Sequence, residues 1–225
     1  MQEYPSGFIL VEHALAKHKL GLMRDRNCDV QMFRRLMRQL GQVLCVAVTQ
    51  DLPLTPKSIQ TPLASTIVDH LDQQKIAVIP ILRAGLVFAE AFHELLPQSR
   101  TGHLGLFRNP NTHIVERYLA SLPSGEFTDF IILDPMIATG ETLTEAVRIL
   151  LDLDVPADRI RVASLIASRT GIERFFEDTR HSGIQVYAIA CDPALSDKGY
   201  IIPGLGDAGD RLFGTADPES ASLSP

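Results

Sequence analysis

The chain is poor in cysteine, and its few thiols are poorly placed for metal binding or cross-linking. Its 225 residues include three cysteines, Cys28, Cys45 and Cys191, with no CxxC pair among them. An odd number of widely spaced thiols argues against a disulfide framework and against a zinc site. We expect small buried side chains in a reducing cytosol.

The chain also lacks an excess of positive charge and a long apolar run. Its net charge of −6 creates no field that attracts nucleic acid or an anionic membrane, so neither is an expected partner. No apolar stretch approaches the roughly 20 residues that cross a bilayer. The polar residues 1–7 lack the pattern of a signal peptide, which favours a cytoplasmic protein. An anionic ligand would therefore require a local basic pocket.

Strand-like and helix-like segments alternate along the chain, and 45% of its residues are hydrophobic. Apolar runs predict strands at 76–82, 103–107, 130–133, 160–166 and 184–190; helical spacing of apolar residues predicts helices at 30–44, 86–96, 141–153 and 173–178. This order favours an α/β fold with a mainly parallel sheet flanked by helices. We expect a single domain over residues 1–215 and a flexible tail over 216–225.

The most informative segment joins a strand to a helix at residues 130–142. Its apolar run ends in Asp134, and a loop of small and hydroxyl-bearing residues precedes the helical pattern. Such a turn directs backbone N–H groups and the positive end of the helix dipole at one point. Thr139, Gly140 and Thr142 add hydroxyls and close backbone approach, and Asp134 is placed to hold sugar hydroxyls or a metal. The segment predicts a site for a phosphorylated sugar.

Two arginines follow other expected strands. Arg83 comes after the run 76–82 and precedes two small residues that open a helix, and Arg108 comes after the run 103–107. Ligands of open α/β sheets bind beyond the carboxyl ends of the strands. A guanidinium there offers a forked donor to a diphosphate. Either arginine alone also fits a surface ion pair, but their common position beside the phosphorylated-sugar segment favours binding.

Residues 192–215 contain five glycines and two prolines and are expected to be a long irregular segment. Irregular segments of this length within a domain are usually functional. The stretch 199–215 has the composition of a loop with exposed backbone polar groups. Such a loop is able to recognise the donor and acceptor edge of a small planar ring.

Taken together, the motifs resemble uracil phosphoribosyltransferase, a type I phosphoribosyltransferase family. The matching strings are 18–24, 81–86, 134–140 and 199–215, in the order of the family. The resemblance implies the type I phosphoribosyltransferase fold, with a uracil-binding hood segment at about 192–215. It also implies an enzyme of pyrimidine salvage, which transfers the phosphoribosyl group of 5-phosphoribosyl 1-diphosphate (PRPP) to uracil and yields UMP and diphosphate.

The resemblance implies a role for each matching position. Arg83 and Arg108 hold the diphosphate, Asp134 meets the ribose hydroxyls, and residues 138–142 surround the 5′-phosphate. Asp207 lies beside both the base and the diphosphate; it and Arg83 are the implied catalytic residues, and Asp207 is a candidate for removing the uracil N1 proton. The full PRPP-binding set is Arg83, Arg108, Asp134, Pro135, Met136, Ile137, Ala138, Thr139, Gly140, Glu141, Thr142 and Asp207. The uracil-binding set is Ile201, Gly206, Asp207 and Ala208.

The same resemblance implies a cofactor and partners. Mg²⁺ is expected to bind mainly through the oxygens of PRPP, since this hard cation keeps few protein ligands. GTP is an implied effector, and a homodimer or larger homo-oligomer is the implied assembly. The apolar stripe of residues 30–44 is a candidate for the subunit interface.

The sequence departs from the family pattern at two places. Glu141 stands where the phosphate loop of the family has glycine, and we expect its side chain to point outward at the start of the helix. Residues 109–118 replace a run that forms a projecting arm in the family, which leaves lid closure, subunit contacts and nucleotide regulation open. An alternative function is a nucleotide sensor or regulator on the same fold, with weak or no turnover.

Overall fold

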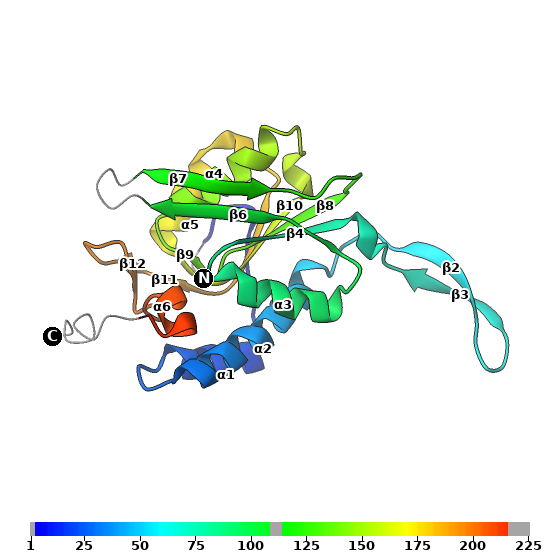
Figure 1. Cartoon of the computed structure of the whole chain (residues 1–225), viewed down its shortest axis with the longest axis horizontal. Helices are drawn as coiled ribbons and strands as arrows, with labels where there is room; N and C mark the ends of the chain where they lie inside the picture. Colours follow the sequence, from blue (N-terminus) through cyan, green and yellow to red (C-terminus); the bar gives the residue numbers. More distant parts are fainter. Residues whose placement is uncertain (1–2, 109–113, 216–225) are drawn as a thin grey trace.

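A computed structural model of the chain describes residues 3–108 and 114–215. Helices cover both faces of a central nine-stranded sheet (Figure 1). Its strands are β1 (Phe8–Leu10), β4 (Ile76–Leu82), β5 (Arg100–Thr101), β6 (His103–Arg108), β7 (Val115–Ser121), β8 (Asp129–Leu133), β9 (Met136–Ile137), β10 (Ile160–Ser168) and β11 (Gln185–Asp192). The main path runs β1-β11-β10-β8-β4-β6-β7, with β5 beside β4 and β9 beside β10. All pairs are parallel except β6 with β7.

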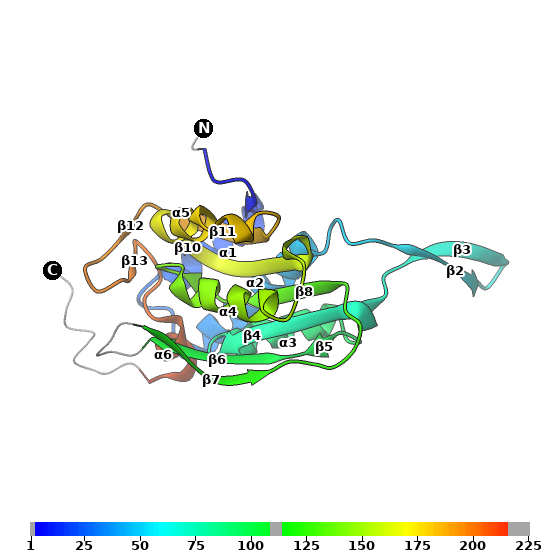
Figure 2. The same ribbon diagram turned by 90° about the horizontal axis from the view of Figure 1, so that it is seen from above.

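The helices form two layers, as Figure 2 shows from above. One layer contains α1 (Ala14–Arg24), α2 (Val30–Val48) and α3 (Gly85–Leu95), and the other contains α4 (Glu141–Leu151) and α5 (Arg169–Glu177). Each layer buries its apolar residues against one face of the sheet, which gives two hydrophobic cores. The central strands are therefore covered on both sides, and all nine residues of β10 are buried. Short 3₁₀ turns stand at Gln73–Lys75, Ala157–Arg159 and Thr179–His181.

Helix α5 begins four residues earlier than the apolar pattern predicts. Ser168 is its N-cap, and the Ser168 hydroxyl accepts a hydrogen bond from the N–H of Gly171 at 2.8 Å. Such a cap satisfies one of the donors that a helix start leaves unpaired. The polar first turn of the helix hid this start from the periodicity.

The apolar stripe of α2 is buried within the chain, so any subunit contact of this helix would use its other face. Its members Phe33, Leu36, Met37, Leu40 and Leu44 are each at most 3% exposed. They belong to the core that α1, α2 and α3 build against the sheet. Amphipathic periodicity shows that a face is buried but not which element covers it, and a subunit contact of α2 stays a prediction.

A two-stranded hairpin projects from the body of the molecule (Figures 1 and 2). It consists of β2 (Thr55–Gln60) and β3 (Ser65–His70), which pair antiparallel only with each other. Sequence periodicity did not reveal it, because every residue of β2 is exposed and no core face alternates with a polar one. The projecting element thus lies at 55–70. Residues 115–118, expected to fill the place of an arm, belong to β7 of the central sheet, and residues 109–113 lie outside the described part.

The segment 192–215 is not irregular throughout, which corrects the expectation from its composition. It contains a small hairpin of β12 (Ala194–Leu195) and β13 (Ile201–Ile202), followed by α6 (Ala208–Phe213). We call β12, β13 and α6 with their connections the hood. The elements are too short for a periodic signal, and Gly199, Gly204 and Gly206 stand in the turns between them. The predicted tail, 216–225, lies outside the described residues.

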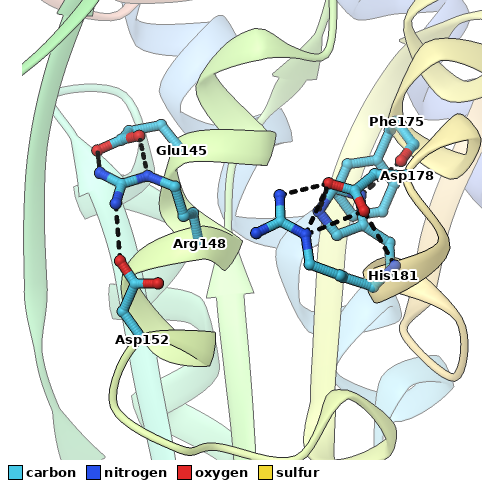
Figure 3. A network of polar contacts seen from close by, with 7 residues as sticks. Glu145, Arg148, Asp152, Phe175, Asp178 and His181 are labelled. Carbon is cyan, nitrogen blue, oxygen red and sulfur yellow. Dashed lines mark hydrogen bonds and ion pairs between the residues drawn. The ribbon is translucent and has the colours of Figure 1, made fainter.

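Polar networks hold the exposed side of α4 and the turn that follows α5 (Figure 3). Arg148 binds Glu145 through two hydrogen bonds and Asp152 through a third. The buried His181 donates from Nδ1 to the carbonyl of Phe175 and stacks on its ring, with 4.2 Å between centroids. No residue of either network lines the two pockets at the sheet edge described below.

The three thiols differ in how far they are buried. Cys45 is buried, whereas Cys28 and Cys191 are only partly buried, and all three are free. Burial raises the pKa of Cys45 to about 12, which keeps this thiol protonated.

Among the described residues, no helix has the length and apolar character that a bilayer crossing requires.

Candidate active site

The carboxyl ends of β4, β6 and β8 meet at one edge of the sheet. Pro80 of β4 pairs with Leu133 of β8, so Arg83 and Asp134, which follow these strands, emerge side by side. They border a cavity of about 370 Å³, which we call the large pocket. Its other walls come from the hood and from the β6–β7 pair. The lining residues are Ile81, Leu82, Arg83, Ala84, Leu106, Phe107, Tyr118, Asp134, Pro135, Met136, Thr142, Asp207, Ala208 and Gly209.

A second cavity, of about 170 Å³, lies over the loop between β9 and α4. We call it the small pocket and the loop, residues 138–142, the phosphate loop. Its lining residues are Asp134, Met136, Ile137, Ala138, Thr139, Gly140, Thr142, Leu143, Lys198 and Gly199. Asp134, Met136 and Thr142 line both pockets, so the two cavities adjoin. Thr139 and Ala208, which the sequence analysis placed in one site, thus border a continuous cleft.

The phosphate loop owes its shape to a glycine in the left-handed region. Gly140 is the N-cap of α4 and has a φ of +83°. A Cβ atom at Gly140 would stand 2.5 Å from the carbonyl oxygen of Gly171, so no larger residue fits without a shift. The first N–H groups of α4 have no partner within the helix, and Gly140 has no side chain to cap them. These groups therefore remain available to a ligand at the loop. The helix dipole adds positive charge there, which suits a phosphate.

Glu141 does not line either of these pockets. It is exposed on the first turn of α4 and borders a separate hollow together with Arg174 and Glu177. Because Glu141 is exposed, solvent screens the repulsion between its carboxylate and an anion bound at the phosphate loop. This position removes the main sequence argument for a weakened phosphate site.

Ser168 braces the phosphate loop from behind. This buried side chain donates a hydrogen bond to the carbonyl of Ala138 and accepts one from the N–H of Gly171. Gly171 fits only as glycine, because a Cβ atom there would lie 2.1 Å from the Ala138 oxygen. The start of α5 thus locks the loop against the sheet.

With the roles that the family resemblance implies, we expect Ser168→Ala to raise the KM for PRPP about fivefold and to leave the KM for uracil unchanged, because the loop loses its anchor and the base pocket does not. Loss of the cap also costs about 1 kcal/mol of stability. Steady-state kinetics and urea unfolding measure the two effects. Ser164→Ala is the matched control, since Ser164 is buried on the same strand and bonds the Ile166 carbonyl at 3.1 Å. An equal rise of the PRPP KM in both variants would contradict the brace.

Asp134 has an unusual environment for a carboxylate. It is partly buried at the junction of the two pockets, and the hydrogen bond that it accepts from the N–H of Met136 is long at 3.5 Å. Burial raises the pKa of Asp134 to about 7, and this hydrogen bond lowers it only in part. A carboxyl with such a pKa changes charge near neutral pH, as functional carboxyls often do.

The sequence predicted that Arg83 and Arg108 bind the diphosphate, and the structure describes the side chain of Arg83. Arg83 is exposed, follows a cis peptide bond from Leu82, and lines the large pocket. Its guanidinium carbon lies 5.7 Å from the centroid of the Phe213 ring in α6. Arg108 ends β6, and its side chain lies outside the described part of the structure.

The hood reaches the large pocket through Asp207, Ala208 and Gly209. Asp207 is the N-cap of α6, and its Oδ1 accepts a hydrogen bond from the N–H of Asp210 at 2.9 Å. Ile201 is buried in β13, and Gly206 is exposed in the following turn with a φ of +77°. Neither is a lining residue of the two pockets, so of the predicted uracil set the structure brings Asp207 and Ala208 to the cleft.

Sequence reasoning assigned no role to the residues that hold the hood in place. Arg24 of α1 binds both oxygens of Asp192 at 2.7 and 2.8 Å and donates to the carbonyl of Gly204 at 2.7 Å. The N–H of Gly204 donates to the same carboxylate at 2.8 Å. Arg24 stands in one of the matching strings, but its partner lies 168 residues away, and no local signal links the two. This network sets the path of the chain just before Asp207.

Arg211 adds a second clamp from within α6. It donates to the carbonyls of Met23 at 2.7 Å and Leu205 at 2.8 Å, and to that of Asp25 at 2.6 Å. Its guanidinium carbon lies 4.5 Å from the centroid of the Phe33 ring. The hood therefore rests on α1 and α2 through partly buried cationic contacts.

Comparison with known proteins gives the same assignment as the cleft. The family model of uracil phosphoribosyltransferase matches residues 10–215. Uracil phosphoribosyltransferase of Rhodospirillum centenum is 41% identical, over 95% of this chain and 97% of that protein, and that of Burkholderia pseudomallei is 40% identical over 94% and 96%.

Solved structures show the same fold. The AQ2163 protein of Aquifex aeolicus superposes with a TM-score of 0.85 at 33% identity and covers 93% of this chain and 99% of that one. Adenine phosphoribosyltransferase of Leishmania donovani shares the fold alone, with a TM-score of 0.55 at 11% identity over 88% and 89%. The predicted type I phosphoribosyltransferase fold is confirmed, and the chain belongs to the uracil phosphoribosyltransferase family.

Proposed function

We propose that this protein transfers the phosphoribosyl group of PRPP to N1 of uracil, forming UMP and releasing diphosphate. The observation that carries the proposal is the pair of adjoining pockets: the phosphate loop borders one, and Arg83 and the hood border the other. The residues shared by both pockets stand where the ribose would join the two ends of the donor. The activity named for the family members at 40–41% identity supports the same reaction.

The proposed mechanism divides the work between the two pockets. The phosphate loop holds the 5′-phosphate, and Asp134 accepts hydrogen bonds from the ribose hydroxyls, which orients the anomeric carbon toward the hood. As the bond to diphosphate breaks, positive charge develops on the ribose and negative charge on the leaving group. Arg83 is placed to stabilise that leaving anion. Residues of the hood orient uracil so that N1 meets the anomeric carbon, and Asp207, which lines the same pocket, accepts the N1 proton directly or through water as the new bond forms.

The cleft fits a cation that the substrate brings with it. Asp134 and Asp207 supply carboxylate oxygens to the large pocket, and oxygen donors are what Mg²⁺ prefers. Within the described residues, no cluster of three or more His, Cys, Asp or Glu side chains offers a ready metal site. When bound, Mg²⁺ would neutralise charge on the diphosphate and ribose oxygens. We propose that these two carboxylates hold it together with PRPP.

The alternative of a sensor without turnover rested on Glu141 and on the altered segment 109–118. Glu141 is exposed and lies outside the two pockets, so it gives that alternative no support. Regulation by GTP stays a prediction, which activity with and without GTP tests.

The function is tested by incubating the protein with labelled uracil, PRPP and Mg²⁺ and separating the products. We expect stoichiometric UMP and diphosphate, with adenine and cytosine as competing bases that yield no nucleotide. Uracil binding without UMP formation would contradict the proposed enzyme and favour the sensor.

We further propose that the protein is a homodimer whose copies meet through the hairpin β2–β3. An isolated two-stranded hairpin is marginally stable in water, yet this one exposes Ile67 (71%), Leu63 (95%) and Ile59 (37%). Each of its strands also has one edge unpaired within the described chain, which a second copy can complete.

Light scattering is expected to report a dimer for the unaltered protein and a shift toward monomer for Ile67→Asp, because a charge is costly in an apolar contact. Leu153→Asp is the control: Leu153 is 60% exposed just beyond the end of α4 and is not part of the hairpin. A dimer that withstands Ile67→Asp would place the interface elsewhere.

A further inference from the structure

The small pocket has a wall that the phosphate loop does not supply. Opposite the loop, Lys198 and Gly199 line it from the turn that joins β12 to β13. A Cβ atom built on Gly199 would lie 3.9 Å from Cγ2 of Thr139. The turn and the phosphate loop therefore face each other across a gap that a single methyl group would bridge, although they are about 60 residues apart in sequence.

Backbone hydrogen bonds hold the position of this turn. The N–H of Gly199 donates to the carbonyl of Ser196, and the N–H of Ser196 donates to the carbonyl of Tyr200, both at 2.8 Å. The hydroxyl of Ser196 accepts a further bond from the N–H of Tyr200 at 3.1 Å. Gly199 has a φ of +80°, which suits the tight turn. Lys198 is thus presented by a closed hairpin of fixed register and not by a loose surface loop.

The charge on Lys198 is uncommitted, in contrast to other cations near the hood. Within residues 3–108 and 114–215, no carboxylate forms an ion pair with Lys198, whereas Arg24 is bound to Asp192 and Arg211 to backbone carbonyls. Lys198 is also the cationic lining residue of the small pocket, where Asp134 is the acidic one. An ammonium group opposite the N-terminus of α4 completes a site for a doubly charged phosphate.

We propose that Lys198 binds the 5′-phosphate of PRPP, so that this phosphate lies between the phosphate loop and the hood. The assignment rests on the proposed function and adds to it a substrate-binding residue from the base-recognising side of the cleft. A phosphate held in this way connects the two halves of the site. Lys198 discriminates between ends of the donor: it contacts the 5′-phosphate and not the diphosphate, which lies toward Arg83.

The test is binding of ribose 5-phosphate and of inorganic diphosphate, each titrated separately into the protein by calorimetry. In Lys198→Gln we expect the Kd for ribose 5-phosphate to rise about tenfold, the loss of one charge-assisted contact, while the Kd for diphosphate changes less than about twofold. Lys198→Arg is expected to stay within about threefold of the unaltered protein, because it keeps the charge.

Lys75→Gln is the matched control for the loss of one positive charge, since Lys75 pairs only loosely with Asp72 at 3.9 Å and stands before the start of β4, at the other end of that strand. Unchanged ribose 5-phosphate binding in Lys198→Gln, or an equal loss for diphosphate, would overturn the assignment. Binding of ribose 5-phosphate needs no uracil and no turnover. A protein that binds it through Lys198 but forms no UMP would therefore refute the proposed reaction and leave the site intact.

Discussion

Replacing Arg83 with alanine is expected to lower kcat/KM for PRPP about 10³-fold. The loss follows from the proposed role, because a preorganised donor aimed at a developing anion is worth a factor of about 10² to 10³. Arg83 is exposed and lies 5.7 Å from the Phe213 ring, so its removal opens no cavity in the core. Stability is expected to change by less than about 0.5 kcal/mol. Initial rates with varied PRPP and thermal unfolding measure the two quantities.

Arg38→Ala serves as the control for this prediction. Arg38 is an exposed arginine on α2 that pairs with Glu90 at 3.1 Å, and such surface pairs contribute little. Its variant is expected to retain activity within about twofold. If Arg83→Ala also kept normal kcat/KM, stabilisation of the leaving diphosphate would have to come from other groups, and the proposed role of Arg83 would be wrong.

Replacing Asp134 with asparagine is expected to remove activity and to stabilise the protein above neutral pH. The pKa of Asp134 is raised by burial from 3.8 to about 7. A carboxyl with a raised pKa binds its proton more tightly when folded, so its contribution to stability falls as the pH rises from about 4 to about 7. A shift of about three units corresponds to at most about 4 kcal/mol. Asparagine carries no charge and avoids this cost.

Urea unfolding at pH 5 and pH 8 measures the effect. The unaltered protein is expected to lose stability between the two values, and Asp134→Asn is expected to lose less. Asp154→Asn, at an exposed turn residue with a φ of +61°, removes an equal charge and is expected to follow the unaltered protein. Activity is expected to change with pH in the opposite direction to stability. The value of kcat/KM for PRPP falls as the pH drops below about 7, because a protonated Asp134 is a poorer acceptor of hydrogen bonds from the ribose hydroxyls. An equal change in the free energy of unfolding between pH 5 and pH 8 in all three proteins would contradict the raised pKa of Asp134.

Local patterns predicted the part of the site that is built from one strand, one turn and one helix. The apolar run before Asp134, the small residues of the loop and the periodicity of α4 are consecutive in sequence, so their geometry follows from neighbours along the chain. The same holds for β4 and for α3 behind Arg83. Their meeting at one edge followed from the βαβ order, because parallel strands place their carboxyl ends together.

Contacts between distant segments escaped prediction, and they decide how the cleft is closed. Arg24 and Asp192 are ordinary charged residues in sequence, and only the packing of α1 beside the end of β11 makes them a clamp for Gly204. Ser168 is likewise one polar residue at the end of a strand until α5 brings it against Ala138.

By itself, the sequence determined the α/β order, the phosphate loop and the family. Each of these depends on residues that are consecutive in the chain, and their spacing indicates the local backbone geometry. Tertiary structure alone decided that the apolar face of α2 is internal, that Glu141 lines neither of the two pockets, and that Lys198 and Thr139 line the same one. The physical reason is that burial and charge pairing depend on which surfaces meet, and local propensity does not specify the partner of a surface.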